Sequence, residues 1–194
     1  HARIGAIDAS AALAVEGVAA VLTGHDIVKV VSPWVGVLTH LAGMRSPPQP
    51  CVATEVARWQ GEPVAMVLAS SRAVAEDAAA LVEVDYEPLE PVCDMEAALE
   101  PGSPLIHPEY DSNLCWERKV EAGDVDAAFA DPANTVVERS FDFGRHTGVT
   151  LEPRGCLCEY DPAEDRITMH YSGQAPHMIQ VVLSKHLGIP EGRV

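Results

Sequence analysis

The chain has 194 residues, with 29 acidic and 13 basic side chains and a formal net charge of −16. This length allows one large domain or two small ones, and it is sufficient to bury a core. The charge disfavours a nucleic-acid binder, because neutralising phosphates requires a basic face, and it equally disfavours attachment to an anionic membrane surface.

The first 50 residues predict short elements followed by an irregular excursion. Residues 2–7 alternate weakly as a strand, Ser10 can cap a short helix, and residues 18–22 are typical of an apolar strand. Residues 32–50 are rich in proline and glycine, which excludes long regular structure. The excursion also holds Trp34, Val35, Val37 and Leu38. These side chains are too apolar for a free linker, so we expect the excursion to lie against another part of the protein.

The clearest supersecondary pattern lies between residues 64 and 86. Residues 64–69 form an apolar run that predicts a strand buried on both faces. Ser70 or Ser71 can cap a helix over residues 72–81, and residues 82–86 then alternate as a half-buried strand. Strand, helix and strand in this order predict a crossover unit of an α/β fold.

A proline-rich acidic segment, residues 87–108, is the best candidate for a domain boundary. Beyond it, Asp124 can cap a helix that runs through residue 129, and alternation over residues 137–143 predicts a strand. Two further strands, residues 156–160 and 167–171, are joined by a turn-rich segment and predict a hairpin. A helix is expected from Pro176 to Gly188, because proline suits the first turn and glycine the end.

The acidity is concentrated in residues 76–165, which hold 23 acidic and 5 basic residues, a net charge of −18. The favoured interpretation is a solvated acidic face. A docking face for a basic partner is the alternative. No run of about 18 apolar residues is present, so we expect no membrane span.

The five cysteines include no Cys-x-x-Cys pair, and the chain is long enough to fold without a disulfide framework. We therefore expect reduced, mostly buried thiols and a cytoplasmic protein. Cys156 and Cys158 would point to one face of a strand. Because this pair lacks partners at metal-ligand spacing, packed core thiols are favoured over a metal site, and no metal ligand is predicted.

Common catalytic signatures are absent, including glycine-rich nucleotide loops, His-Glu-x-x-His and Gly-x-Ser-x-Gly. Lone histidines such as His40 and His170 are more often structural than ligands. Residues 150–155 contain Glu152 and Arg154 around a proline, which could form a fixed ion pair or an ordinary surface turn. The surface turn is the favoured interpretation.

A second stretch, residues 172–177, joins a predicted strand to a predicted helix. Such junctions collect ligand groups in α/β folds, because backbone N–H donors and the helix dipole converge there. Gln174 offers both a donor and an acceptor at this point. The alternative is that the stretch simply begins a helix and includes a convenient polar residue, and the residues alone do not decide between the two.

Taken together, these segments resemble the molybdenum-binding large subunit of the xanthine dehydrogenase, aldehyde oxidase and carbon monoxide dehydrogenase family. Residues 1–8, 17–24 and 61–89 resemble the family's α/β-hammerhead domain. Residues 123–129, Leu151-Glu152-Pro153-Arg154-Gly155 and Gln174-Ala175-Pro176-His177 resemble the start of its molybdopterin-binding region. The resemblance covers nearly the whole chain and is weakest over residues 27–48.

The resemblance implies an α/β (α+β) fold in two parts. Residues 1–105 would form a hammerhead domain lacking its first residues, and residues 106–194 the first strands and helix of a truncated molybdopterin-binding domain. It also implies that Gln174 hydrogen-bonds the apical oxygen ligand of molybdenum, with Gly173 beside the cofactor. The family's glycine-rich Gly-Phe-Gly segment and its catalytic glutamate do not occur here, so no catalytic residue is expected in this chain.

The parent protein implied by the resemblance oxidises an aldehyde, a purine or other N-heterocycle, or carbon monoxide, with water as the oxygen source. Its cofactor would be molybdenum-molybdopterin in the cytosine dinucleotide form. Electrons would pass to an iron–sulfur small subunit and an FAD-containing medium subunit, in a dimer of heterotrimers. We expect these 194 residues to be an inactive N-terminal piece. A non-catalytic scaffold or subunit-docking domain that uses the acidic face is the alternative.

Overall fold

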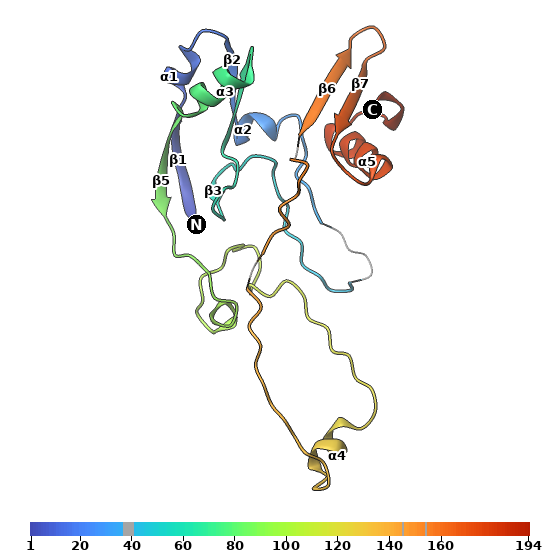
Figure 1. Cartoon of the computed structure of the whole chain (residues 1–194). Coiled ribbons are helices and arrows are strands. Elements are labelled where there is room, and N and C mark those ends of the chain that lie inside the picture. The colour runs from blue at the N-terminus through green and yellow to red at the C-terminus, as the bar shows by residue number, and fades with distance from the viewer. Residues whose placement is uncertain (37–40, 145, 154) are drawn as a thin grey trace.

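The computed structural model describes residues 1–36, 41–144, 146–153 and 155–194. Within these ranges the strands form one three-stranded and two two-stranded sheets, all with antiparallel pairing. Short helices pack beside them, which makes this a mixed α/β fold (Figure 1). None of the helices in the described ranges combines the length and the apolar character that crossing a membrane would need.

Two of the sheets are built from the first 88 residues. In one, β1 (Ala2–Asp8) lies between β3 (Val56–Ala57) and β5 (Glu83–Pro88). In the other, β2 (Val18–Thr23) pairs with β4 (Ala65–Ala69). The predicted crossover unit is therefore wrong in its pairing, because β4 and β5 belong to different sheets and each pairs with an earlier strand. The sequence pattern located these strands but could not identify their partners.

The helices of this half are short and depend on local caps. In α3 (Arg72–Ala79), the Ser71 hydroxyl accepts a hydrogen bond from the Val74 N–H at 3.3 Å, which confirms one of the two predicted caps. In α1 (Ser10–Leu13), Ser10 is the first helical residue instead of the predicted cap. Its N–H donates to the Asp8 carboxylate at 2.8 Å, so Asp8 takes the capping role.

Among the α-helices of the described residues, α2 (Gly24–Ile27) was not predicted; it is a single turn that begins at a capping box. The Asp26 carboxylate accepts hydrogen bonds from the Thr23 N–H at 3.0 Å and from the Thr23 hydroxyl at 2.9 Å. These bonds, the one from the Thr23 backbone first, stabilise the ionised carboxylate and lower the pKa of Asp26 to about 2. Because α2 is only one turn long, its sequence contains no helical periodicity that could predict it.

The core is small and lies in the N-terminal half. Its buried apolar side chains, among the described residues, are Ile4, Ala12, Ile27, Val52, Ala53 and Ala78. The prediction that both faces of β4 are buried is wrong, because Met66 and Leu68 on one face are 44% and 42% exposed. This face is therefore only partly covered by the described residues.

The irregular excursion lies against the second half of the chain, as its apolar residues predicted. The Arg45 N–H donates to the Cys115 carbonyl at 2.8 Å, and the Trp116 indole N–H donates to the Ala42 carbonyl at 3.3 Å. Of the excursion residues named above, Val37, Leu38 and His40 fall outside the described residues.

A long arm, residues 117–153, leaves the rest of the molecule and returns, with α4 (Val125–Ala130) at its far end (Figure 1). Asp124 caps α4 as predicted, accepting a hydrogen bond from the Ala127 N–H at 2.9 Å. The strand predicted over residues 137–143 is wrong: the described residues of this segment form no ladder, and Phe141 is 90% exposed. A strand requires a partner, and none of the described segments pairs with this one.

The C-terminal unit matches its prediction closely. The predicted hairpin forms from β6 (Cys156–Asp161) and β7 (Arg166–Tyr171), followed by α5 (Pro176–Leu187) and the 3₁₀ turn η2 (Glu191–Arg193). Gly188 ends α5 in the left-handed conformation with φ of 67°. The unit contacts the N-terminal half through Ser32, whose N–H donates to the His186 carbonyl at 3.0 Å.

Candidate functional site

The predicted site residues lie in the turn that joins β7 to α5, which we call the Gln174 turn (residues 172–175). The strand ends at Tyr171 because Ser172 and Gly173 leave the ladder, and the helix begins at Pro176, whose missing N–H costs nothing in a first turn. The turn therefore presents Gln174 at the positive end of a 12-residue helix dipole.

The Gln174 side chain is exposed, and among the described residues nothing is hydrogen-bonded to its amide. The amide can therefore offer a donor and an acceptor to a group outside these residues. Free N–H groups of the first turn of α5 lie close by in the chain, so the surroundings favour a partner with negative or partly negative oxygen atoms.

The Gly173 backbone lies close to the edge of the Tyr171 ring. A Cβ atom at position 173 would clash with Cε2 of that ring and would lie 2.6 Å from its Cδ2, closer than real Cβ contacts allow. A side chain here would have to displace the ring, and glycine avoids this, which the sequence did not predict. Packing against Tyr171 thus explains Gly173 without a contact to a cofactor.

The two predicted motifs lie side by side. The Ser172 hydroxyl donates to the Pro153 carbonyl at 3.1 Å, and the Ser172 N–H donates to the Gly155 carbonyl at 3.4 Å. The segment around Pro153 therefore supports one side of the Gln174 turn. Arg154, the possible partner of Glu152, lies outside the described residues, so both the ion pair and the ordinary surface turn remain open.

The cysteines differ from the prediction. All five are free and exposed, so the expectation of mostly buried thiols is wrong. Cys156 and Cys158 do lie two residues apart on β6, but they are not packed in a core, because no described element covers them there. Desolvation, followed by the neighbouring Cys156, raises the pKa of Cys158. Within the described ranges no group of three or more His, Cys, Asp or Glu side chains could hold a metal ion.

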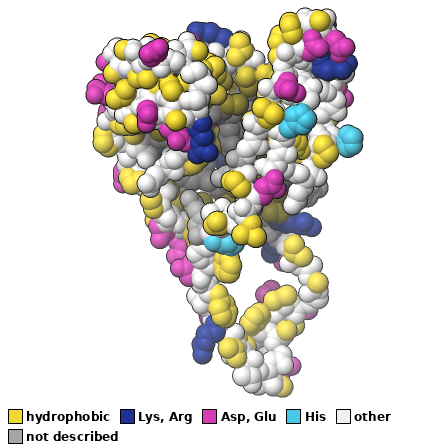
Figure 2. Space-filling view, turned by 45° about the horizontal axis from the view of Figure 1, so that its top comes forward, with side chains coloured by type: hydrophobic (Ala, Val, Ile, Leu, Met, Phe, Trp, Pro, Cys, Tyr) yellow, Lys and Arg dark blue, Asp and Glu magenta, His cyan; other side chains and the backbone are white. Residues whose placement is uncertain are grey.

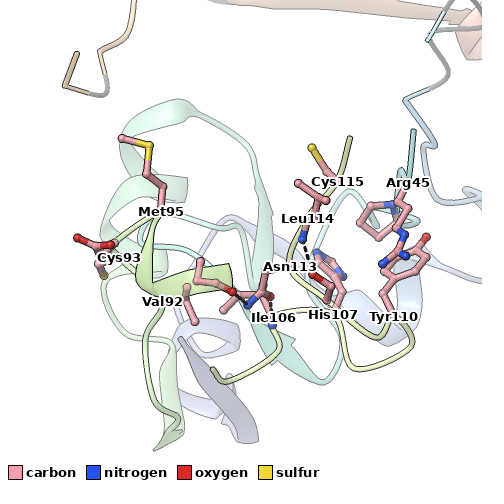
Figure 3. A pocket seen from close by; sticks show the side chains of 14 residues that line it. Arg45, Val92, Cys93, Met95, Ile106, His107, Tyr110, Asn113, Leu114 and Cys115 are labelled. Carbon is pink, nitrogen blue, oxygen red and sulfur yellow. Dashed lines mark hydrogen bonds between the residues drawn. The ribbon is translucent and has the colours of Figure 1, made fainter. Parts of the chain in front are cut away.

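A pocket of about 280 Å³ lies away from the Gln174 turn, where the excursion meets the proline-rich segment (Figure 3). Three of its polar side chains, those of Arg45, His107 and Asn113, already have partners in the protein. Arg45 pairs with Asp111 at 2.5 Å and lies over the Tyr110 ring, 5.8 Å from the ring centroid. His107 pairs with Glu109 at 3.3 Å.

Asn113, which also lines this pocket, uses its whole amide to hold the wall together. Its Oδ1 accepts from the Ile106 N–H at 3.1 Å, and its Nδ2 donates to the carbonyls of Ala98 and Pro104 at 3.0 and 2.9 Å. Since these polar groups already have partners inside the protein, we interpret the pocket as a structural seam. Sequence reasoning missed it because its residues are spread over some 70 positions.

The acidic side chains on the visible face of the molecule are scattered among apolar ones (Figure 2). They do not gather there into one continuous patch. This arrangement agrees with the favoured interpretation of solvated acidic residues. On that face it shows no defined surface on which a basic partner could dock.

Two family profiles match the chain in sequence order. The hammerhead domain of aldehyde oxidase and xanthine dehydrogenase matches residues 1–90, and the molybdopterin cofactor-binding domain matches residues 106–194. The chain is 38% identical over 193 residues to the nicotine 6-hydroxylase large subunit of Paenarthrobacter nicotinovorans, covering 100% of this chain and 23% of the relative. It is 35% identical over 208 residues to the carbon monoxide dehydrogenase large chain of Afipia carboxidovorans, covering 100% and 25%.

Solved structures give the same result. Quinoline 2-oxidoreductase from Pseudomonas putida 86 superposes with a TM-score of 0.92 at 33% identity, covering 99% of this chain and 24% of that one. Aldehyde oxidoreductase from Desulfovibrio gigas superposes with a TM-score of 0.85 at 27% identity, covering 99% and 21%. The chain thus spans between a fifth and a quarter of the length of each of these four proteins.

Proposed function

Because this chain belongs to the aldehyde oxidase and xanthine dehydrogenase family, we propose that it is the N-terminal part of a molybdenum hydroxylase large subunit. The observation that carries the proposal is the order of the two profile matches, which together account for nearly the whole chain. The family is enzymatic, and its named relatives oxidise chemically different substrates. We further propose the division into a hammerhead domain over residues 1–105 and the start of a molybdopterin-binding domain over residues 106–194.

The residues of the Gln174 turn fit an oxygen-bearing metal group. In the described part of the chain, no cluster of three or more His, Cys, Asp or Glu side chains could ligate a metal. We propose that the pterin holds the metal. An exposed amide with both functions free suits a hydrogen bond to an oxygen on such a group. When bound, the molybdenum–pterin group would supply the two-electron oxidation and the oxygen transfer.

In the proposed site, Gln174 orients the cofactor by a hydrogen bond from its side-chain N–H. The Gln174 turn is anchored at its two ends, because Ser172 attaches it to the segment around Pro153 and α5 begins directly after it. The proposed contact between Gly173 and the cofactor is secondary, since packing already explains that glycine. We place no catalytic residue in this chain, and the proton-accepting group would come from the remainder of the subunit.

For the complete protein we propose a substrate that is an aldehyde, an N-heterocycle or carbon monoxide, with water as the source of oxygen. The cofactor would be the cytosine dinucleotide form of molybdopterin. Iron–sulfur and FAD subunits would accept the electrons in a cytoplasmic dimer of heterotrimers. Support for a separate large subunit comes from the relatives, which are named as large subunits or large chains.

The proposal is tested by comparing these 194 residues with the complete protein. We expect the purified 194-residue chain to hold no stoichiometric molybdenum in elemental analysis and to lack turnover. The complete protein should contain about one molybdenum per subunit and reduce an artificial electron acceptor with one of the three substrate classes. Absence of molybdenum from the complete protein, purified from a host that makes the cofactor, would contradict the proposal.

The alternative is a non-catalytic scaffold or docking domain that binds a basic partner through its acidic residues. The net charge of −18 over residues 76–165 is the observation that favours it. A complete protein without molybdenum that nevertheless retains a basic subunit at low salt, and releases it at high salt, would favour this function.

A further inference from the structure

We propose that Tyr171 is the positioning residue for Gln174, because its ring braces the backbone of Gly173 and thereby fixes the direction of the next side chain. The inference rests on the proposed function, in which the Gln174 amide contacts the cofactor. Tyr171 itself makes no such contact in the proposed site, so its role is exerted only through the Gln174 turn.

The bracing follows from the close approach of the ring to residue 173. The atoms that would lie 2.6 Å and 3.0 Å from a Cβ at this position are ring carbons, so the space above the Gly173 backbone is filled by the ring of Tyr171. The three atoms nearest to that position all belong to the ring of Tyr171. The backbone at 173 cannot move toward the ring, and a side chain cannot be added there without displacing the ring.

The Gln174 turn needs such a brace, because hydrogen bonds anchor it only at its two ends. Ser172 is attached to Pro153 and Gly155, and the Ile179 N–H donates to the Ala175 carbonyl at 3.0 Å in the first turn of α5. Between these anchors, no hydrogen bond within the described residues holds the backbone of Gly173 or Gln174. The ring of Tyr171 packs against this unanchored section.

The ring of Tyr171 lies between β7 and α5. Tyr171 is half-buried, and together with Ile179 and Leu183 it lines a cavity of about 510 Å³ between β7 and α5. Its hydroxyl oxygen is buried and has no hydrogen-bond partner among the described residues. The hydroxyl therefore contributes no bond to the turn here, and the aromatic ring alone accounts for the bracing.

A double-mutant cycle on the complete protein tests the brace. Gly173→Ala, Tyr171→Ala and the double variant are compared by the amide hydrogen exchange of Ser172, whose N–H is hydrogen-bonded to the Gly155 carbonyl. Gly192→Ala is the matched control, because a Cβ there meets nothing within 4 Å. We expect Gly173→Ala to accelerate exchange by about tenfold or more, the lower range of an overpacking cost. In the Tyr171→Ala background the same substitution should have a several-fold smaller effect. Equal effects in both backgrounds would overturn the brace.

The consequence for the reaction is measured separately. Tyr171→Ala should lower kcat by roughly tenfold or more with an unchanged molybdenum content, and KM should change less. Tyr171→Phe keeps the ring and should restore both kcat and the exchange protection. If Phe does not restore them, the hydroxyl is required and the ring-only account is wrong. If the exchange cycle shows coupling but kcat does not respond, the brace holds and the proposed role of Gln174 fails.

Discussion

The pocket wall formed by residues 98–113 depends on one amide, that of Asn113. Replacing Asn113 with alanine removes three hydrogen bonds, to Ile106, Ala98 and Pro104, from a partly buried site. At a net contribution of about 1 kcal/mol for each bond, the expected loss is about 2–4 kcal/mol, the upper end applying if the carbonyls remain without water. A loss of this size is a large part of the stability of an ordinary domain.

Urea unfolding followed by tryptophan fluorescence measures the Asn113→Ala effect, with the amide exchange of Ile106 as a local probe. Asn134→Ala is the matched control, since the Asn134 amide makes one exposed hydrogen bond, to the Ala128 carbonyl at 2.8 Å. The control should lose less than about 1 kcal/mol. If Asn113→Ala costs no more than Asn134→Ala, the amide does not hold this pocket wall.

Four further predictions concern separate sites. Gln174→Ala should lower turnover of the complete enzyme by about 10²–10³-fold. The urea midpoint should stay unchanged, because the side chain is exposed. Normal turnover would show that Gln174 is not part of the site. Gly24→Ala should lower the free energy of unfolding by about 1–3 kcal/mol or more, as measured in urea, because a Cβ would lie 2.8 Å from the Val52 carbonyl oxygen. An unchanged urea midpoint would contradict this packing. The pKa of Asp26 is lowered to about 2 from 3.8, so its stabilisation is complete above pH 4 and is lost as the pH falls toward 2; in acid titrations Asp26→Asn should remove this part of the pH dependence, and identical curves would refute it. All five cysteines should react with a thiol reagent in the folded 194-residue chain, and fewer reactive thiols would indicate cover that the structure lacks.

Elements with strong local signals were predictable from the sequence. The hairpin, the start of α5 at Pro176 and its end at Gly188 follow from turn and capping residues, and the structure has all of them. The cap of α4 by Asp124 is another case. In each, the interactions that define the element lie within a few residues, so the sequence pattern contains the required information.

Features that depend on distant partners were not predictable. Alternation over residues 137–143 is typical of a strand, but a strand forms only where another segment supplies the ladder. The same holds for the pairing of β4 and β5 with earlier strands and for the exposure of the five thiols. Both depend on which distant segments of the chain lie against these residues. The sequence also located the Gln174 turn as a candidate site. It did not show that Tyr171 packs on Gly173, because spacing by two residues does not specify where a ring lies.

The arm has a consequence for how the chain behaves in concentrated solution. Its extended apolar residues, with Phe141 90% and Phe143 80% exposed, combine the two properties that favour strand-to-strand aggregation between copies. Acidic side chains interrupt the apolar run, at Glu138 and Asp142 among others. The repulsion between these carboxylates on different molecules opposes self-association. Colloidal stability of the isolated chain should therefore depend on keeping these carboxylates ionised, and should fall with added salt or acid.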